Sequence, residues 1–246
     1  MSGHSKWSTI KRKKALVDAK RGKVFTKIIR ELTTCARTGG SDLDSNARLR
    51  TIVDKAKAAN MPQNNIERAI QKGAGELDGA NYEEITYEGY GPGGVALLID
   101  VLTDNRNRTV GEIRYLLGKH GGNLGETGSV AWKFEARGLI QVTKGDLELD
   151  DVILMVVDAG ADDVQEEEEE FSIFTAVSDL EQVRKACLES ELEITTYELT
   201  QIPKMDLQIE GSTIGSVMKL IDLLDDLDDV QSVYTDADFD EAELDG

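Results

Sequence analysis

The spacing of hydrophobic residues changes near residue 80, and this change limits the fold more than any other feature of the sequence. Before it, apolar residues recur every three or four positions, as they do along one face of an amphipathic helix. Residues 23–37 and 45–60 follow this pattern, and a shorter stretch with Ile66, Ala69 and Ile70 repeats it before a glycine. Because three such helices can share one small core, we predict a helical N-terminal domain.

Beyond residue 80 the pattern is that of strands alternating with helices. Residues 84–88 and 94–101 are predicted strands joined by a glycine-rich turn, and a helix and a strand near residues 130–135 follow them. Between residues 138 and 199 the predicted order is strand, helix, strand, strand, helix, strand. This is the order of a ferredoxin-like domain.

The last forty residues complete the prediction. A strand over residues 205–209, a helix and a strand over residues 230–234 supply the elements that the stretch after residue 80 lacks. We therefore predict an α+β protein with an N-terminal three-helix domain followed by two ferredoxin-like α+β domains, one inserted into the other. The predicted boundaries are 1–80 for the helical domain, 81–136 with 204–246 for the outer ferredoxin-like domain, and 137–203 for the inserted one.

Charge is divided unevenly along the chain. Residues 1–75 hold 17 Lys and Arg against 6 Asp and Glu, a net charge of +11, whereas the remainder holds 11 against 41, a net charge of −30. Salt screens such fields beyond about 10 Å, so a phosphate near the first domain responds to the local positive excess. The acidic composition of the whole chain therefore does not exclude a nucleic-acid partner.

Several functional classes are not expected. No stretch reaches the ~18 consecutive apolar residues of a membrane span, so we expect a soluble intracellular protein without a membrane partner. The two cysteines, Cys35 and Cys187, lie far apart and are predicted to be reduced core residues, and His4 and His120 have no ligand set around them. We expect no metal, no cofactor and, since no catalytic motif series is present, no enzymatic activity.

The first thirty residues hold ten cations opposed by Asp18 alone, which is the electrostatic footprint of a phosphate binder. A solvated surface is the alternative interpretation. Trp7 either stacks on an exposed base or docks onto the helices, and the sequence supports both equally. The candidate nucleic-acid-binding residues here are Lys6, Trp7, Lys11, Arg12, Lys13, Lys14, Lys20, Arg21, Lys23, Lys27 and Arg30.

Arg106 and Arg108 are further candidates, because they lie where a predicted strand gives way to a helix. Unpaired backbone N–H groups at a helix start favour phosphate. Alternatively, Asn107 or Thr109 caps the helix and the arginines pair with Asp104 or Glu112. Both interpretations stay open at this point.

Nothing in the sequence specifies base recognition or a nucleotide pocket. Lys and Arg on phosphates carry no sequence information, and no zinc finger or clear helix-turn-helix accompanies them. The glycines of residues 89–94 do not have the spacing of a nucleotide-binding loop. Acidic runs at residues 166–170, 222–229 and 236–245 are predicted to be solvated surface that repels nucleic acid and suits basic partners such as ribosomal proteins.

Eight motifs in order along the chain resemble the YebC/PmpR family over essentially its full length. They are GHSKW at residues 3–7, DAKRGK at 18–23, FTK at 25–27, NMP at 60–62, NI at 65–66, RAI at 68–70, YEGYGPGG at 87–94 and TDNRNRT at 103–109. The resemblance implies a three-domain, non-enzymatic cytoplasmic protein described as a DNA-binding transcriptional regulator. A mitochondrial relative is the translational activator of cytochrome c oxidase subunit I, and members are also connected with the ribosome.

Two functions follow from these observations. One is a DNA-binding transcriptional regulator; the other is a ribosome-associated translation factor that binds ribosomal RNA and relieves stalling at proline-rich stretches. The family description favours transcription, whereas the lack of a base-reading helix and the acidic bulk favour the ribosome. The target sequence and the oligomeric state do not follow from the sequence.

Overall fold

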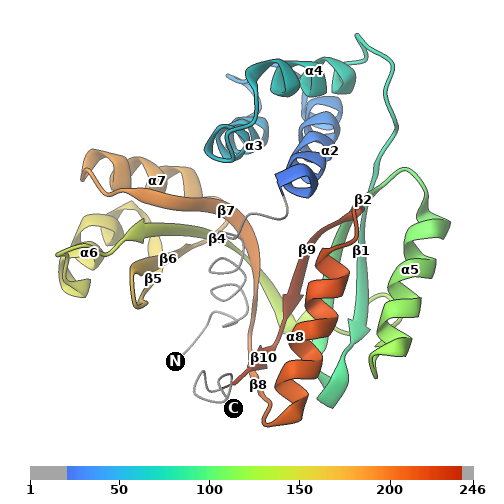
Figure 1. The fold of residues 1–246 in the computed structure, drawn as a ribbon. Coiled ribbons are helices and arrows are strands. Elements are labelled where there is room, and N and C mark those ends of the chain that lie inside the picture. The colour runs from blue at the N-terminus through green and yellow to red at the C-terminus, as the bar shows by residue number, and fades with distance from the viewer. Residues whose placement is uncertain (1–20, 240–246) are drawn as a thin grey trace. The chain divides into compact units, whose positions relative to one another are not determined.

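The computed structural model describes residues 21–239 (Figure 1). Its first part consists of α2 (Arg21–Gly39), α3 (Ala47–Ala58) and α4 (Gln63–Gly73). Their apolar faces meet in one core that includes Ile28, Leu32, Leu49 and Ile66. The predicted helical N-terminal region is therefore confirmed.

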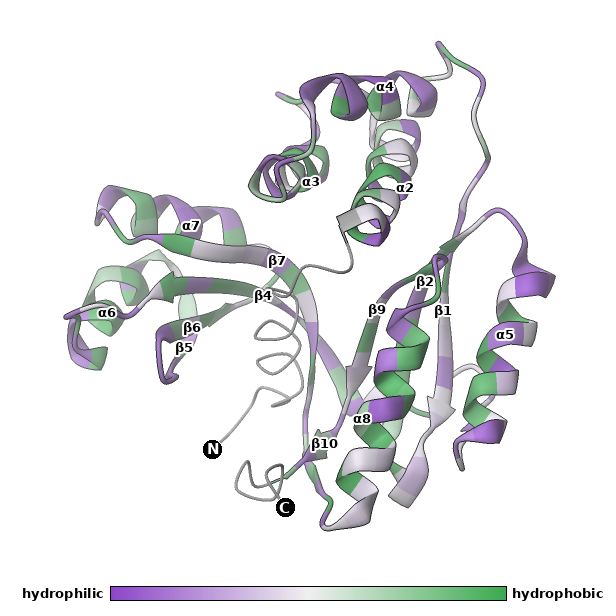
Figure 2. Cartoon of the chain, in the orientation of Figure 1, coloured by the Kyte–Doolittle hydropathy of each residue, from purple (hydrophilic) through white to green (hydrophobic). Residues whose placement is uncertain are grey.

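A four-stranded antiparallel sheet follows, with the strand order β3-β1-β2-β9. The helices α5 and α8 share one apolar core with this sheet, so both cover the same face of it. Figure 2 shows apolar and polar residues alternating around both helices, as expected for elements packed on one side only. The bounds are β1 (Glu83–Tyr90), β2 (Ala96–Thr103), α5 (Arg106–Lys119), β3 (Asn123–Leu124), α8 (Ser212–Asp225) and β9 (Val230–Thr235).

Residues 135–202 form a separate compact unit, while the residues up to 134 and from 203 onward form the other. Its strand order β5-β6-β4-β7, with one helix after β4 and one after β6, is that of a ferredoxin-like sheet. The predicted sequence of elements in this stretch is confirmed. The bounds are β4 (Phe134–Thr143), α6 (Leu149–Val156), β5 (Ala161–Glu166), β6 (Glu170–Thr175), α7 (Leu180–Glu189) and β7 (Ile194–Pro203).

One predicted strand of the outer sheet is wrong, and another is shorter than predicted. Near residues 130–135 the chain forms the short 3-10 helix η2 (Ala131–Lys133), and the third strand is β3 instead. The predicted strand over residues 205–209 shortens to β8 (Leu207–Gln208), which pairs in parallel with β10 (Ala237–Asp238) outside the main sheet. Numbered along the chain, the strands of the outer sheet have the order 3-1-2-4 and begin with the β1–β2 hairpin, whereas those of the inserted sheet have the order 2-3-1-4.

The remaining expectations concern single groups. Cys35 and Cys187 are both free and buried, as predicted. Among residues 21–239 no helix is long and apolar enough to cross a membrane. The same residues contain no cluster of three or more His, Cys, Asp or Glu arranged to hold a metal ion. The boundary that we predicted near residue 80 lies within one of the two compact units, so the three-domain division stays a prediction.

Candidate nucleic-acid interface

The thirteen predicted nucleic-acid-binding residues fall into three groups. Lys6, Trp7, Lys11, Arg12, Lys13, Lys14 and Lys20 lie outside the described residues. Arg21 begins α2, and its side chain is not described. The others lie on α2 and at the start of α5.

Lys23 and Lys27 lie four residues apart on α2 and therefore share a face of the helix. Lys23 Nζ donates to the Asp226 carbonyl oxygen at 3.0 Å and lies 3.5 Å from Asp226 Oδ1. Lys27 Nζ donates to Asp225 Oδ1 at 3.2 Å and to the Asp225 carbonyl oxygen at 2.9 Å. Aspartates at the end of α8 thus neutralise two of the predicted phosphate-binding cations.

Arg30, one turn further along α2, contacts more partners than either lysine. Its guanidinium pairs with the Asp229 carboxylate and donates to the carbonyl oxygens of Asp228 at 2.8 Å and Leu102 at 3.0 Å. The Arg30 guanidinium also lies 5.3 Å from the centre of the Tyr82 ring. Arg30 is therefore engaged in tying α2 to the turn before β9 and to the end of β2.

Asp229 is the centre of this network and is only 3% exposed. Its Oδ2 accepts hydrogen bonds from Arg108 Nη2 at 2.6 Å, Thr109 Oγ1 at 2.6 Å and Thr103 Oγ1 at 3.1 Å. Burial alone would raise the pKa of Asp229, but the bonds from Arg108, Thr109 and Arg30 outweigh it and lower the pKa to about 2. We predicted that residues 222–229 form a solvated acidic surface, and Asp229 shows that this was wrong for the end of the run.

The two arginines at the start of α5 have different surroundings. Asn105, and not Asn107 or Thr109, caps α5 by accepting from the Arg108 backbone N–H at 3.1 Å. The Arg108 guanidinium contacts Asp104 at 2.9 Å as well as Asp229, and these two carboxylates raise its pKa further. Of the two interpretations left open above, the ion pair with Asp104 is what the structure shows for Arg108.

Arg106 is exposed, and it has no ion pair among the described residues. Further along α5, Arg114, Tyr115 and Lys119 are also exposed, although the sequence analysis does not select them. A signal for them was present: once Ile113 and Leu117 are assigned to the core, the helical spacing of about 100° per residue places Arg114, Tyr115 and Lys119 away from the core face.

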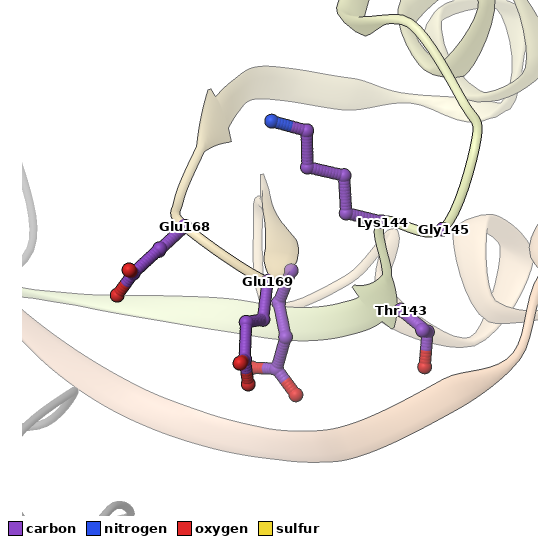
Figure 3. Close-up of a pocket in the computed structure, with 6 residues that line it drawn as sticks. Thr143, Lys144, Gly145, Glu168 and Glu169 are labelled. Atoms are coloured by element: carbon purple, nitrogen blue, oxygen red, sulfur yellow. The ribbon is translucent and has the colours of Figure 1, made fainter.

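A hollow of about 490 Å³ in the inserted unit has the opposite charge. It is lined by Thr143, Lys144, Gly145 and three consecutive glutamates, Glu168, Glu169 and Glu170 (Figure 3). Lys144, its cation, pairs with Glu166. Because the lining carries a net negative charge, this hollow is unsuited to a phosphate group.

The fold and the distribution of charge define an α+β protein with a basic helical end and an acidic sheet-containing remainder. The chain belongs to the TACO1/YebC family: residues 5–76 match the N-terminal domain of the TACO1/YebC protein, and residues 82–237 match the TACO1/YebC second and third domain.

Relatives resemble the chain over nearly its full length. A protein of Desulforamulus reducens is 51% identical over 96% of this chain and 98% of its own, and one of Moorella thermoacetica is 54% identical over 100% and 98%; both are named probable transcriptional regulatory protein. A crystal structure of a conserved hypothetical protein from Aquifex aeolicus has a TM-score of 0.85 and 44% identity, and the match covers 92% of this chain and 94% of that one.

Proposed function

We propose that this protein is a non-enzymatic regulator of transcription that binds DNA phosphates through its basic N-terminal end. Its curated relatives are named probable transcriptional regulatory proteins. The observation that carries the proposal is the charge distribution, a net +11 over residues 1–75 beside a net −30 over the rest. Such segregation attracts a polyanion to one end of the chain and repels it from the remainder.

The ion pairs of α2 decide which cations we assign to phosphate. Seven of the ten cations among the first thirty residues precede Lys23. Because Lys23, Lys27 and Arg30 already contact aspartate side chains, a phosphate would have to compete with those carboxylates at α2. The proposal therefore assigns phosphate contacts first to Lys6, Lys11, Arg12, Lys13, Lys14, Lys20 and Arg21.

The salt dependence of DNA binding tests this assignment. If five to seven cations contact phosphates, log affinity for a labelled 20-base-pair duplex should fall with log salt at a slope of roughly −4.5 to −6. Fluorescence anisotropy in about 50 to 300 mM KCl would measure this slope. Replacing Lys11, Arg12, Lys13 and Lys14 together by glutamine should make the slope shallower by about 3.6.

A matched control replaces four cations of the acidic remainder, Lys144, Lys185, Lys204 and Lys219, by glutamine. The net charge of the protein changes equally in both variants, so only local contacts distinguish them. The control should keep the original slope. Duplex binding that does not respond to salt, or equal effects of the two variants, would contradict the proposal.

A further inference from the structure

The helix α5 concentrates positive charge within the acidic part of the chain. Of the 11 Lys and Arg after residue 75, four lie between Arg106 and Lys119, where Glu112 is the one acidic residue. Arg108 is engaged by Asp104 and Asp229. Arg106 and Arg114 are exposed and have no ion pair within residues 21–239. The outer surface of α5 is thus positive although its surroundings are negative.

Tyr115 lies on the same surface and is 62% exposed. The Lys119 ammonium lies over the Tyr115 ring, 5.4 Å from its centre, so a cation and an aromatic ring are presented together. Aromatic side chains next to cations form the stacking platforms with which proteins hold unpaired bases. The tyrosine therefore adds to the charge a feature that favours one kind of polyanion.

The geometry of the helix separates these groups from the core. Thr109, Ile113 and Leu117 are buried, so the opposite face of α5 points away from the sheet. At about 100° per residue, Arg114 and Tyr115 lie on either side of a line through Gly111 and Gly118. A Cβ added at either glycine would meet no atom of the described residues within 4 Å. Nothing in the described structure covers the strip between the arginine and the tyrosine.

The length of the surface matches a short piece of nucleic acid. At a rise of about 1.5 Å per residue, Arg114 and Lys119 lie about 7.5 Å apart along the helix axis. This is close to the length of two stacked nucleotides at about 3.4 Å each. At about 100° per residue, Arg114 and Lys119 lie on the two sides of Tyr115, whereas Arg106 lies about 180° from the tyrosine and is not part of this surface.

We propose that the exposed face of α5 binds a single strand of nucleic acid. Arg114 and Lys119 contact phosphates, and Tyr115 stacks on an unpaired base. An unpaired base is required because the faces of paired bases are covered by their neighbours in the duplex. The inference rests on the proposed nucleic-acid-binding function and adds to it a second contact surface, in a different part of the chain from the basic N-terminal end.

The test uses the full-length protein and a fluorescein-labelled 12-nucleotide oligo(dT), with oligo(U) and a 12-base-pair duplex as further probes. Anisotropy gives the affinity of each probe over a range of salt. Four variants are measured: Arg114→Gln/Lys119→Gln, Tyr115→Ala, Tyr115→Phe and Gly111→Gln. The control is Lys185→Gln/Lys219→Gln, which changes the net charge as much as the first variant does.

For oligo(dT), the Arg114→Gln/Lys119→Gln variant should have a salt slope shallower by about 1.4, and the control an unchanged one. Tyr115→Ala should weaken binding at least about fivefold, whereas Tyr115→Phe, which keeps the ring, should stay within about twofold. Gly111→Gln should also weaken binding while leaving the protein folded by circular dichroism, because the new side chain fills only the strip. Comparing oligo(U) with oligo(dT) shows whether the surface prefers RNA or DNA. Weaker binding of either probe by the α5 variants than by the wild type supports the same surface.

Two results would overturn the inference while leaving the proposed function standing. In the first, the wild type and the α5 variants bind oligo(dT) with equal affinity, although the variant with glutamine at residues 11–14 has lost affinity for the duplex. In the second, the α5 variants bind the duplex more weakly but bind oligo(dT) and oligo(U) as the wild type does. If polyglutamate displaces the labelled oligo(dT) as well as unlabelled oligo(dT) does, and Tyr115→Ala has no effect, the partner would instead be an acidic protein. If the wild type binds none of the three probes, the proposed function itself fails.

Discussion

Arg30 and Asp229 form an ion pair although 199 residues separate them in the chain. Both side chains are largely buried, and the carboxylate also accepts a hydrogen bond from Arg108. One aspartate thus balances two arginines from two helices, α2 and α5. A cation that the sequence assigns to phosphate binding therefore serves to hold two parts of the fold together.

Replacing Asp229 by asparagine should strongly destabilise the protein. The substitution leaves Arg30 and Arg108 without their shared charge, and removing one partner of a buried ion pair costs about 3–5 kcal/mol. Urea denaturation followed by circular dichroism measures the free energy of unfolding. Asp228→Asn is the control, because Asp228 is exposed and only its backbone carbonyl contacts Arg30. A similar small effect of both substitutions would show that the Asp229 network does not stabilise the fold.

The contribution of Asp229 should depend on pH in the acid range. Its folded-state pKa of about 2 is below the usual 3.8, so the unfolded chain takes up the proton first as the pH falls. The stabilisation is fully present above about pH 5 and decreases by about 2 kcal/mol as the pH falls from about 4 through 2.

Other carboxylates also titrate in that range, so the informative quantity is the difference in unfolding free energy between wild type and Asp229→Asn. This difference should be constant between roughly pH 5 and 7 and should shrink below pH 4. Parallel stability curves down to pH 2 would be inconsistent with a lowered pKa for Asp229.

Glu88→Gln should loosen the loop that carries Trp132. The buried Glu88 carboxylate accepts from the backbone N–H groups of Gly128 at 2.6 Å, Val130 at 2.7 Å and Ala131 at 2.8 Å. Burial raises the pKa of Glu88, but these three bonds outweigh it and lower the pKa overall. An amide group turns an N–H toward some of these donors, so we expect a loss of about 2–3 kcal/mol in unfolding free energy.

Hydrogen exchange checks the location of that effect. The amides of Gly128, Val130 and Ala131 should exchange faster in Glu88→Gln than in the wild type. Glu84→Gln is a suitable control, because Glu84 lies at the surface in an exposed pair with Arg48 and such pairs contribute at most about 1 kcal/mol. Unchanged protection of the three amides would rule out the carboxylate as the group that holds this loop.

Two glycine-to-alanine substitutions should act in opposite directions. A Cβ at Gly122 would lie 2.3 Å from the backbone oxygen of Tyr90, so Gly122→Ala must displace β3 from β1 and should cost about 1–3 kcal/mol. A Cβ at Gly118 meets nothing within 4 Å, and alanine favours the helix, so Gly118→Ala should stabilise by about 0.5–1 kcal/mol. Thermal unfolding compares the two, and destabilisation by both would contradict the open surface described for α5.

The sequence predicts most of the elements but not all of their partners. The helices α2, α3 and α4 follow from apolar spacing, because each buries one face in a local core. The strand predicted near residues 130–135 is absent, since the N–H groups of Val130 and Ala131 donate to Glu88 and are unavailable to a sheet. A short apolar run looks the same whether it forms a strand or a loop. The Glu88 carboxylate, which decides between the two here, lies about forty residues earlier in the chain.

The candidate site shows the same limit. Arg106 and Arg108 are equivalent by sequence, yet the structure pairs the second with Asp229 and leaves the first without an ion pair among residues 21–239. The acidic run before β9 gave no sign that its last member is buried, because charged residues are usually solvated. Arg114 and Tyr115 are not predicted from the sequence for a different reason: they lie apart from the basic run and belong to no motif.

Amino-acid order alone established the helical and strand periods, the ferredoxin-like succession of residues 138–199 and the separation of positive from negative charge, since these properties depend on near neighbours. Folding decided which cations are accessible. Lys23, Lys27 and Arg30 meet aspartates about two hundred residues away, and only the packing of α2 beside the end of α8 brings those charges within bonding distance.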